Sequence, residues 1–151
     1  MRVSAKTDYA LRAAAELAAA GGGPVKREQL STAQGIPPKF LENILGDLRH
    51  ARLIRSQRGA EGSYWLARPA EEISVADIVR AVEGPLATVR GEPPEDVAYV
   101  GAAEQLQHVW IAVRKSIRDV VENVTVADVA SGKLPADVAK LARDPEAWVT
   151  R

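Results

Sequence analysis

The sequence contains no cysteine in 151 residues. Without thiolates the chain can form no disulfide framework, no cysteine-ligated metal centre and no thiol nucleophile. Long apolar runs are also missing: none approaches the roughly 18 residues of a membrane-spanning helix, and the N-terminus carries no apolar leader. We therefore expect a soluble, cytoplasmic protein that has no membrane partner.

Net charge is absent as well, because 20 Lys and Arg residues balance 20 Asp and Glu residues. The balance conceals an asymmetry. Residues 1–68 hold 11 basic and 6 acidic side chains, a net charge of +5, whereas residues 69–151 hold 9 and 14, a net charge of −5. A basic half joined to an acidic half is typical of a chain in which one half binds a polyanion. Two solvated faces of opposite sign are the alternative.

The first 68 residues have the pattern of three helices and a two-stranded ribbon. Gly21–Pro24 ends the first helical pattern, Gly35 opens a tight turn, and Pro38 suits the first turn of the third helix, where its missing N–H costs nothing. Apolar residues recur on one face of that third helix, and we expect Phe40 to begin this buried face. We expect helices over about residues 4–20, 26–34 and 38–51, and strands over 53–56 and 63–66.

The second half is predicted to be helical around a loop. Ser74 suits the N-cap of a helix over residues 75–83, and Gly84 and Pro85 end it. Residues 85–100, which are rich in proline and acidic side chains, are expected to form the loop. Helical patterns follow over about residues 102–124, 125–130 and 135–147.

The longest pattern, over residues 102–124, carries an apolar seam whose members advance by three or four positions each time. A helix of about 23 residues with a near-heptad seam is difficult to bury inside so small a domain, so it predicts a homodimer. Packing on its own domain is the alternative. The predicted dimer interface comprises Leu106, Val109, Trp110, Val113, Ile117, Val120 and Val124.

Two short helices joined by a tight turn, preceded by a helix and followed by a ribbon, predict a winged helix-turn-helix. The fold class is therefore mainly α with a small β-wing, followed by a long dimerisation helix. The outward N-terminal side chains of the second short helix would face a DNA major groove. Arginines at four positions between residues 49 and 58 give the ribbon a positive charge, and Arg58 beside Gly59 suits a narrow minor groove. The alternative is that these arginines are solvated side chains at the C-terminal end of a helix, where the helix dipole favours cations.

The order of several segments resembles the IscR/NsrR/CymR-type ("Rrf-two") family of winged helix-turn-helix transcriptional regulators. The segments that carry the resemblance are Asp8–Arg12, Ile36–Glu42, Leu53–Ser56, Arg58–Pro69, Glu72–Val79 and Val82–Pro85. The resemblance is close over residues 1–85 and loose in the long helix. It implies a homodimeric regulator, usually a repressor, that binds a palindromic operator in double-stranded DNA.

The resemblance and the residue pattern together define the predicted DNA-binding set and domain boundaries. The set comprises Arg2, Ser4, Pro38, Lys39, Glu42, Asn43, Arg49, Arg55, Arg58 and Gly59. The winged helix-turn-helix would span residues 1–84, a sensor-type loop 85–101, and the dimerisation helix with a C-terminal helical extension 102–151. In the ribbon, we expect Trp65 to pack on the strand surface.

The sequence departs from many relatives in one respect. They carry three cysteines between the fourth helix and the dimer helix that ligate an iron–sulfur cluster, whereas residues 85–106 contain none. His50 and His108 lie on different predicted helices without a second ligand, so we expect no metal and no cofactor. A small-molecule or protein effector would then act near residues 85–110. Tyr99 and Trp110 are candidate lining residues there, and packing in the core or the interface is the favoured alternative for both.

Other functions are possible for such a fold. One alternative is a winged helix that serves as a protein-interaction module without specific DNA binding. An enzyme is not expected, because no Ser-His-Asp/Glu set is recognisable and the glycines at positions 21–23 follow a helix and lack the Lys-Ser/Thr of a phosphate-binding loop. Steep salt dependence of operator binding would distinguish DNA recognition from the protein-interaction alternative.

Overall fold

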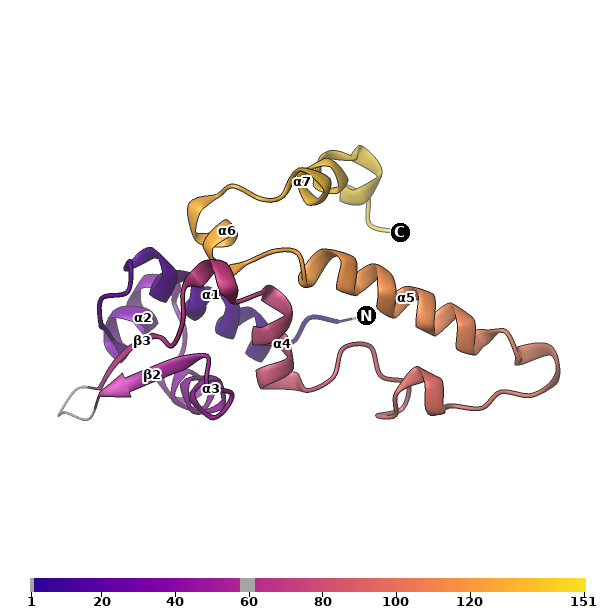
Figure 1. The fold of residues 1–151 in the computed structure, drawn as a ribbon, viewed down its shortest axis with the longest axis horizontal. Coiled ribbons are helices and arrows are strands. Elements are labelled where there is room, and N and C mark those ends of the chain that lie inside the picture. Colours follow the sequence, from indigo (N-terminus) through magenta and orange to yellow (C-terminus); the bar gives the residue numbers. More distant parts are fainter. Residues whose placement is uncertain (1, 58–61) are drawn as a thin grey trace.

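The structure, a computed structural model, describes residues 2–57 and 62–151. It is mainly helical with one small antiparallel sheet, as the sequence predicts (Figure 1). The helices are α1 (Ala5–Ala19), α2 (Arg27–Gln34), α3 (Pro38–His50), α4 (Val75–Glu83), α5 (Leu106–Val121), α6 (Val126–Ser131) and α7 (Ala136–Arg143). The strands are β1 (Val25–Lys26), β2 (Ile54–Gln57) and β3 (Ser63–Leu66), and short 3-10 turns are η1 (Ala70–Glu72), η2 (Pro94–Asp96), η3 (Gly101–Ala103) and η4 (Pro145–Trp148).

The core forms around α1, which contacts α2, α3, α4 and α6. Ala10, Ala13 and Ala14 are completely buried on α1, and their small side chains let the neighbouring helices approach closely. Larger side chains such as Leu30 and Ile44 fill the space between these helices. Burying one such side chain stabilises the fold by about 1.5–3 kcal/mol. This core therefore holds α2 and α3 in a fixed relation to each other.

The wing is a three-stranded sheet in the order β1-β3-β2. The predicted ribbon of β2 and β3 is present, with Ile54 opposite Leu66 and Arg55 opposite Trp65. A third strand, β1, pairs with β3 through Val25 and Lys26, although the sequence predicts a helix from residue 26. Two residues carry too little alternation to predict a strand, and tertiary pairing decides their conformation. The tip residues Arg58 and Gly59 lie outside the described residues.

After α5 the chain returns to the core. The Val75 N–H donates to the Val124 carbonyl and the Val126 N–H donates to the Ile73 carbonyl, both at 2.8 Å. Thr125 caps α6 and forms an isolated bridge with Ser74. Val126 is buried in the same cluster as the α1 side chains. Residues 124–131 are therefore packed on the winged-helix core, although the sequence pattern groups them with the C-terminal extension.

Several predicted details are wrong. The long helix covers residues 106–121 rather than 102–124, because residues 101–103 form a 3-10 turn and Val124 pairs with the start of α4. The last pattern divides into α7 and η4, because Pro145 cannot continue an α-helix. Phe40 is 52% exposed and not in the core. Among the described residues, no helix is long and apolar enough to cross a membrane.

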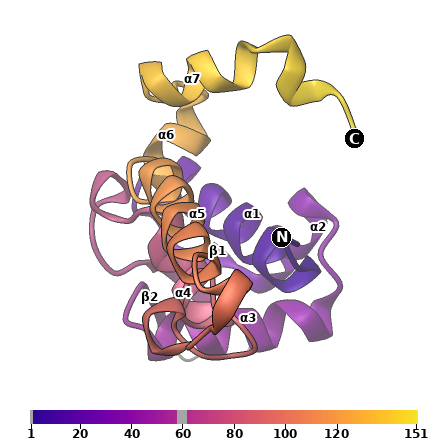
Figure 2. The same cartoon turned by 90° about the vertical axis from the view of Figure 1, so that its right-hand side faces the viewer.

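The C-terminal segment stands apart from the core. In both views α7 and the C-terminus lie away from α1, α2 and α3 (Figure 2). Among residues 132–151, all of which the structure describes, none is buried. The exposed apolar side chains there include Leu141 and Trp148, whose indole N–H donates to the Ala142 carbonyl. The winged-helix core is thus complete before this segment begins.

Candidate nucleic-acid interface

Helix α3 presents a polar face to solvent because its apolar side chains other than Phe40 lie on the opposite face. Four of them are buried in the core: Leu41, Ile44, Leu45 and Leu48. Pro38 occupies the first turn, so the helix starts immediately after the chain turns at Gly35, whose φ is +60°. The predicted DNA-binding residues Pro38, Lys39, Glu42 and Asn43 are all exposed at the N-terminal half of α3.

This exposed face can read DNA by well-defined chemistry. The Lys39 ammonium can contact a phosphate or a guanine edge, and the Glu42 carboxylate can accept from a cytosine amino group. The Asn43 amide can both donate and accept, which suits adenine. Phe40 lies beside them, and its ring packs edge-on against Tyr9 with centroids 6.0 Å apart. The contact between Tyr9 and Phe40 thus joins the start of α3 to α1.

Arg12 on α1 fixes the turn that precedes α3. Its Nη1 donates to the Gln34 carbonyl at 2.7 Å, and its Nη2 lies 3.0 Å from an Asp8 carboxylate oxygen. The guanidinium carbon also sits 4.7 Å from the centre of the Tyr9 ring, a cation–π contact. Sequence reasoning missed this role, because the partner carbonyl is 22 residues away and no local pattern marks it.

Replacing Arg12 with alanine is expected to loosen the helix-turn-helix. The change removes a charged hydrogen bond and a cation–π contact, so the free energy of unfolding should fall by about 1–2 kcal/mol. Urea denaturation measures this decrease. The control is Lys115→Ala, which removes a cation from an exposed pair with Asp119 and should change stability by less than about 0.5 kcal/mol. Equal effects of the two variants would contradict the positioning role.

Ser4 joins α1 to α4 at the N-terminus. Its Oγ accepts from the Thr7 N–H at 3.1 Å, which makes it the N-cap of α1, and it also contacts the Glu83 carboxylate. Thr7 Oγ1 donates to the same carboxylate oxygen at 3.0 Å. The hydroxyl hydrogen bonds from Ser4 and Thr7 hold the pKa of Glu83 below its ordinary value. Arg2, the other predicted residue here, is exposed.

Helix α5 leaves an apolar face uncovered. Of its residues, all described by the structure, none is fully buried. Exposed fractions of 38–48% are found for Leu106, Val109, Trp110 and Val113. The next members of the seam, Ile117 and Val120, are half-buried. Val124 differs from the rest: it lies beyond the helix and is 5% exposed, because its own chain covers it.

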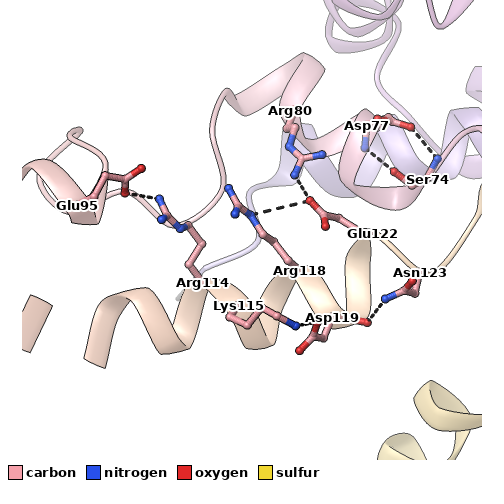
Figure 3. A network of polar contacts seen from close by, with 10 residues as sticks. All are labelled: Ser74, Asp77, Arg80, Glu95, Arg114, Lys115, Arg118, Asp119, Glu122 and Asn123. Carbon is pink, nitrogen blue, oxygen red and sulfur yellow. Dashed lines mark hydrogen bonds and ion pairs between the residues drawn. The ribbon is translucent and has the colours of Figure 1, made fainter. Parts of the chain in front are cut away.

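Ion pairs hold α5 against the rest of the chain (Figure 3). Arg114 Nη1 lies 2.5 Å from a Glu95 carboxylate oxygen in η2, and Arg80 on α4 pairs with Glu122. The pKa of Glu95 is lowered, mainly by a hydrogen bond from the Glu95 backbone N–H and secondly by the hydrogen bond from Arg114. The first ion pair links α5 to the loop after α4, and the second links the residue that follows α5 to α4.

A cavity of about 320 Å³ lies between the N-terminus of α1, the end of α4 and α5. Its polar lining includes Arg2, Ser4 and Glu83, and its apolar wall includes Val79 and Ile117. The predicted effector region is close to this place, but neither Tyr99 nor Trp110 lines the cavity. The positions of Tyr99 and Trp110 relative to the cavity depend on the path of the loop after α4, which the sequence does not specify.

Metal-binding clusters are not found among the described residues: no group of three or more His, Cys, Asp or Glu side chains there could hold an ion. His50 is exposed at the end of α3, with Nδ1 2.9 Å from the Gly46 carbonyl oxygen, and His108 is exposed on α5. Since the whole sequence lacks cysteine, the donor set does not fit an iron–sulfur cluster.

A helix-turn-helix whose second helix exposes a polar face, followed by a three-stranded wing, defines a winged helix-turn-helix protein of the kind that binds DNA. Comparison with known proteins gives the family. A family model described as "Rrf2: Iron-dependent Transcriptional regulator" matches residues 3–132. The chain belongs to the Rrf2 family, and it is a DNA-binding transcriptional regulator rather than an enzyme.

Individual relatives support this assignment over nearly the whole chain. The putative HTH-type transcriptional regulator Rv1287 of Mycobacterium tuberculosis is 54% identical over 145 residues, which are 95% of this chain and 90% of that protein. CymR of Bacillus subtilis is 32% identical over 87% of this chain and 91% of CymR. The solved structure of that CymR, titled the global cysteine regulator, superposes with a TM-score of 0.73, 30% identity and coverage of 87% and 98%. T. potens IscR gives a TM-score of 0.66 at 32% identity, with coverage of 100% and 93%.

Proposed function

We propose that the protein is a homodimeric repressor that binds a palindromic operator and is controlled by a small-molecule or protein effector. It would act in the cytoplasm on double-stranded DNA. Family membership supports the DNA partner. The dimer, the repression and the effector are the parts that we add here.

The observation that supports the proposed dimer is the uncovered apolar face of α5. Four large apolar side chains are each more than a third exposed along one helix, which is unfavourable in an isolated protomer. A second copy of the same helix would cover them by twofold symmetry. A twofold dimer also places two α3 helices to read two half-sites one or more helical turns apart, which explains a palindromic operator.

The signal is proposed to reach the protein without an iron–sulfur cluster. Soft thiolates ligate such clusters, and the chain has none. The cavity between α1, α4 and α5 is the proposed effector site, since it touches both the DNA-binding domain and the α5 helix. A ligand there would need a differential affinity of only about 1–3 kcal/mol between two half-site spacings to regulate binding.

Recovery of genomic DNA tests this function. The purified full-length protein is incubated with sheared DNA of its source organism, and the bound fragments are sequenced. We expect enrichment of a small number of promoter fragments that share one palindrome. Uniform recovery of fragments, or none, would contradict operator recognition and favour the protein-interaction alternative.

A further inference from the structure

The cavity between α1, α4 and α5 has a lining of mixed character, which indicates the chemical class of its ligand. Its volume of about 320 Å³ lies at the lower end of the range of ligand pockets, about 300–1,000 Å³, and suits a small metabolite. The aliphatic part of the lining includes Val79 of α4 and Ile117 and Val121 of α5. The polar groups come from the N-terminal residues, the end of α4 and the loop that follows it.

Glu83 offers this cavity an ionised carboxylate with one free oxygen. The hydroxyls of Ser4 and Thr7 both contact Oε1, the one from Thr7 at 3.0 Å. In the part of the chain that the structure describes, Oε2 has no hydrogen-bond or ion-pair partner. The hydrogen bonds from Ser4 and Thr7 keep the pKa of Glu83 below its ordinary value, so the carboxylate is charged at neutral pH. A primary ammonium group, with three N–H donors, is the natural partner for the free oxygen.

Arg2 supplies the opposite charge in the same lining. Within residues 2–57 and 62–151, it forms no ion pair with Glu83 or with any other carboxylate. The Thr88 hydroxyl also lines the cavity and has no hydrogen bond within those ranges. Two charges of opposite sign that do not neutralise each other match a ligand that carries both signs.

The same lining disfavours other classes of metabolite. None of its residues, all of which the structure describes, is aromatic, so a nucleobase or a flavin would find no ring on which to stack. A phosphorylated compound would meet a single arginine, and the Glu83 carboxylate would repel it. A wholly apolar ligand would bury the Arg2 and Glu83 charges without partners.

We propose that this cavity binds an aliphatic amino acid. Its ammonium group would bond to Glu83, its carboxylate to Arg2, and its side chain would pack against Val79 and Ile117. The proposal rests on the proposed effector site and names the class of molecule that occupies it.

The position of the cavity connects such a ligand to both parts of the protein. Its lining joins the N-terminal end of α1 to α4 and α5. The Arg80–Glu122 ion pair already links α4 to the residue after α5 (Figure 3). A ligand in the cavity would add a second link, and it would thereby restrict the movement of α5 relative to the DNA-binding domain.

The test uses L-leucine and two truncated analogues that keep its branched aliphatic group. 3-Methylbutylamine lacks the carboxylate, and 4-methylpentanoate lacks the ammonium group. Isothermal titration calorimetry is performed on the full-length wild type, on Glu83→Gln and on the control Glu104→Gln. Glutamine keeps a carbonyl oxygen that accepts from Ser4 and Thr7 but removes the charge. Glu104 is an exposed glutamate outside the cavity lining.

We expect L-leucine to bind wild type with a dissociation constant below about 1 mM. Each analogue should bind at least about 10-fold more weakly, because it lacks one charged hydrogen-bonding group. Glu83→Gln should lower the affinity for L-leucine by a similar factor, and Glu104→Gln should match wild type. Absence of L-leucine binding, an analogue that binds as tightly as L-leucine, or a Glu83→Gln protein with the affinity of wild type would each overturn the amino-acid site.

Operator affinity in the presence of saturating L-leucine distinguishes this site from the proposed function. Fluorescence anisotropy should show a change of about fivefold or more for wild type and none for Glu83→Gln. If L-leucine binds as expected but operator affinity does not change, the amino-acid site stands and the effector role of the cavity fails. If the palindrome is recognised and L-leucine does not bind, the amino-acid site is wrong and operator recognition stands. If neither binds, the proposed function fails as well.

Discussion

Replacing Val113 with aspartate is expected to convert the proposed dimer into a monomer. Val113 is 40% exposed in the middle of the uncovered α5 face, flanked by Val109 and Ile117 at helical spacing. In a twofold interface the substitution buries two carboxylates, and no basic partner is available within the apolar seam. A cost of more than about 3 kcal/mol per protomer is expected from burying an unpaired charge. Ile117→Asp should act in the same way.

Light scattering coupled to gel filtration measures the outcome. The matched control is Leu141→Asp, which places the same charge on an apolar residue of α7 that is 60% exposed and lies outside the seam. This control should keep the mass of wild type. Because a monomer can engage only one half-site, the Val113 variant should also lose most of its operator affinity. A Val113→Asp protein that keeps the mass of a dimer would place the interface elsewhere.

Replacing Lys39 with alanine is expected to weaken operator binding without changing stability. Lys39 is exposed on the solvent side of α3, one residue after the proline that starts the helix. Removing a phosphate or guanine contact should cost about 1–3 kcal/mol of binding free energy for each half-site. Fluorescence anisotropy with the recovered operator measures it.

The control for this substitution is Lys133→Ala, which removes another exposed lysine from the segment after α6. The affinity of this variant should fall by less than about twofold, because Lys133 lies outside α3 and the wing strands and contributes only a screened, long-range effect. Thermal denaturation should give both variants the stability of wild type. Equal decreases in binding for the two variants would mean that net charge, and not position on α3, determines the affinity.

Much of the DNA-binding fold could be predicted from local patterns. In α3, the i, i+3, i+4 spacing of Leu41, Ile44 and Leu48 predicts which face is buried, and all three are buried. Ser74 caps α4 through the Asp77 N–H, as its position before an apolar run predicts. These features depend on neighbours within one or two turns, so the sequence specifies them directly.

Features that depend on distant partners could not be predicted. Val124 continues the apolar spacing of α5, but its carbonyl bonds to the start of α4, so the helix ends earlier. The exposure of Phe40 follows from its packing on Tyr9 at the surface and not in the core. The Arg12 contact with the Gln34 carbonyl likewise arises only when segments far apart in sequence meet. The predicted contacts of Arg58 and Gly59 remain predictions, because these residues lie outside the described ranges.

The central claim is that this chain recognises an operator as a twofold DNA-binding protein. The salt dependence of binding tests it most directly, measured by anisotropy on the recovered palindrome and on a scrambled duplex of equal length. The account predicts two protomers per palindrome, a steep linear fall of log affinity with log salt concentration, and at least about 10³-fold tighter binding to the palindrome. A flat salt profile, or equal affinity for the two duplexes, would contradict it.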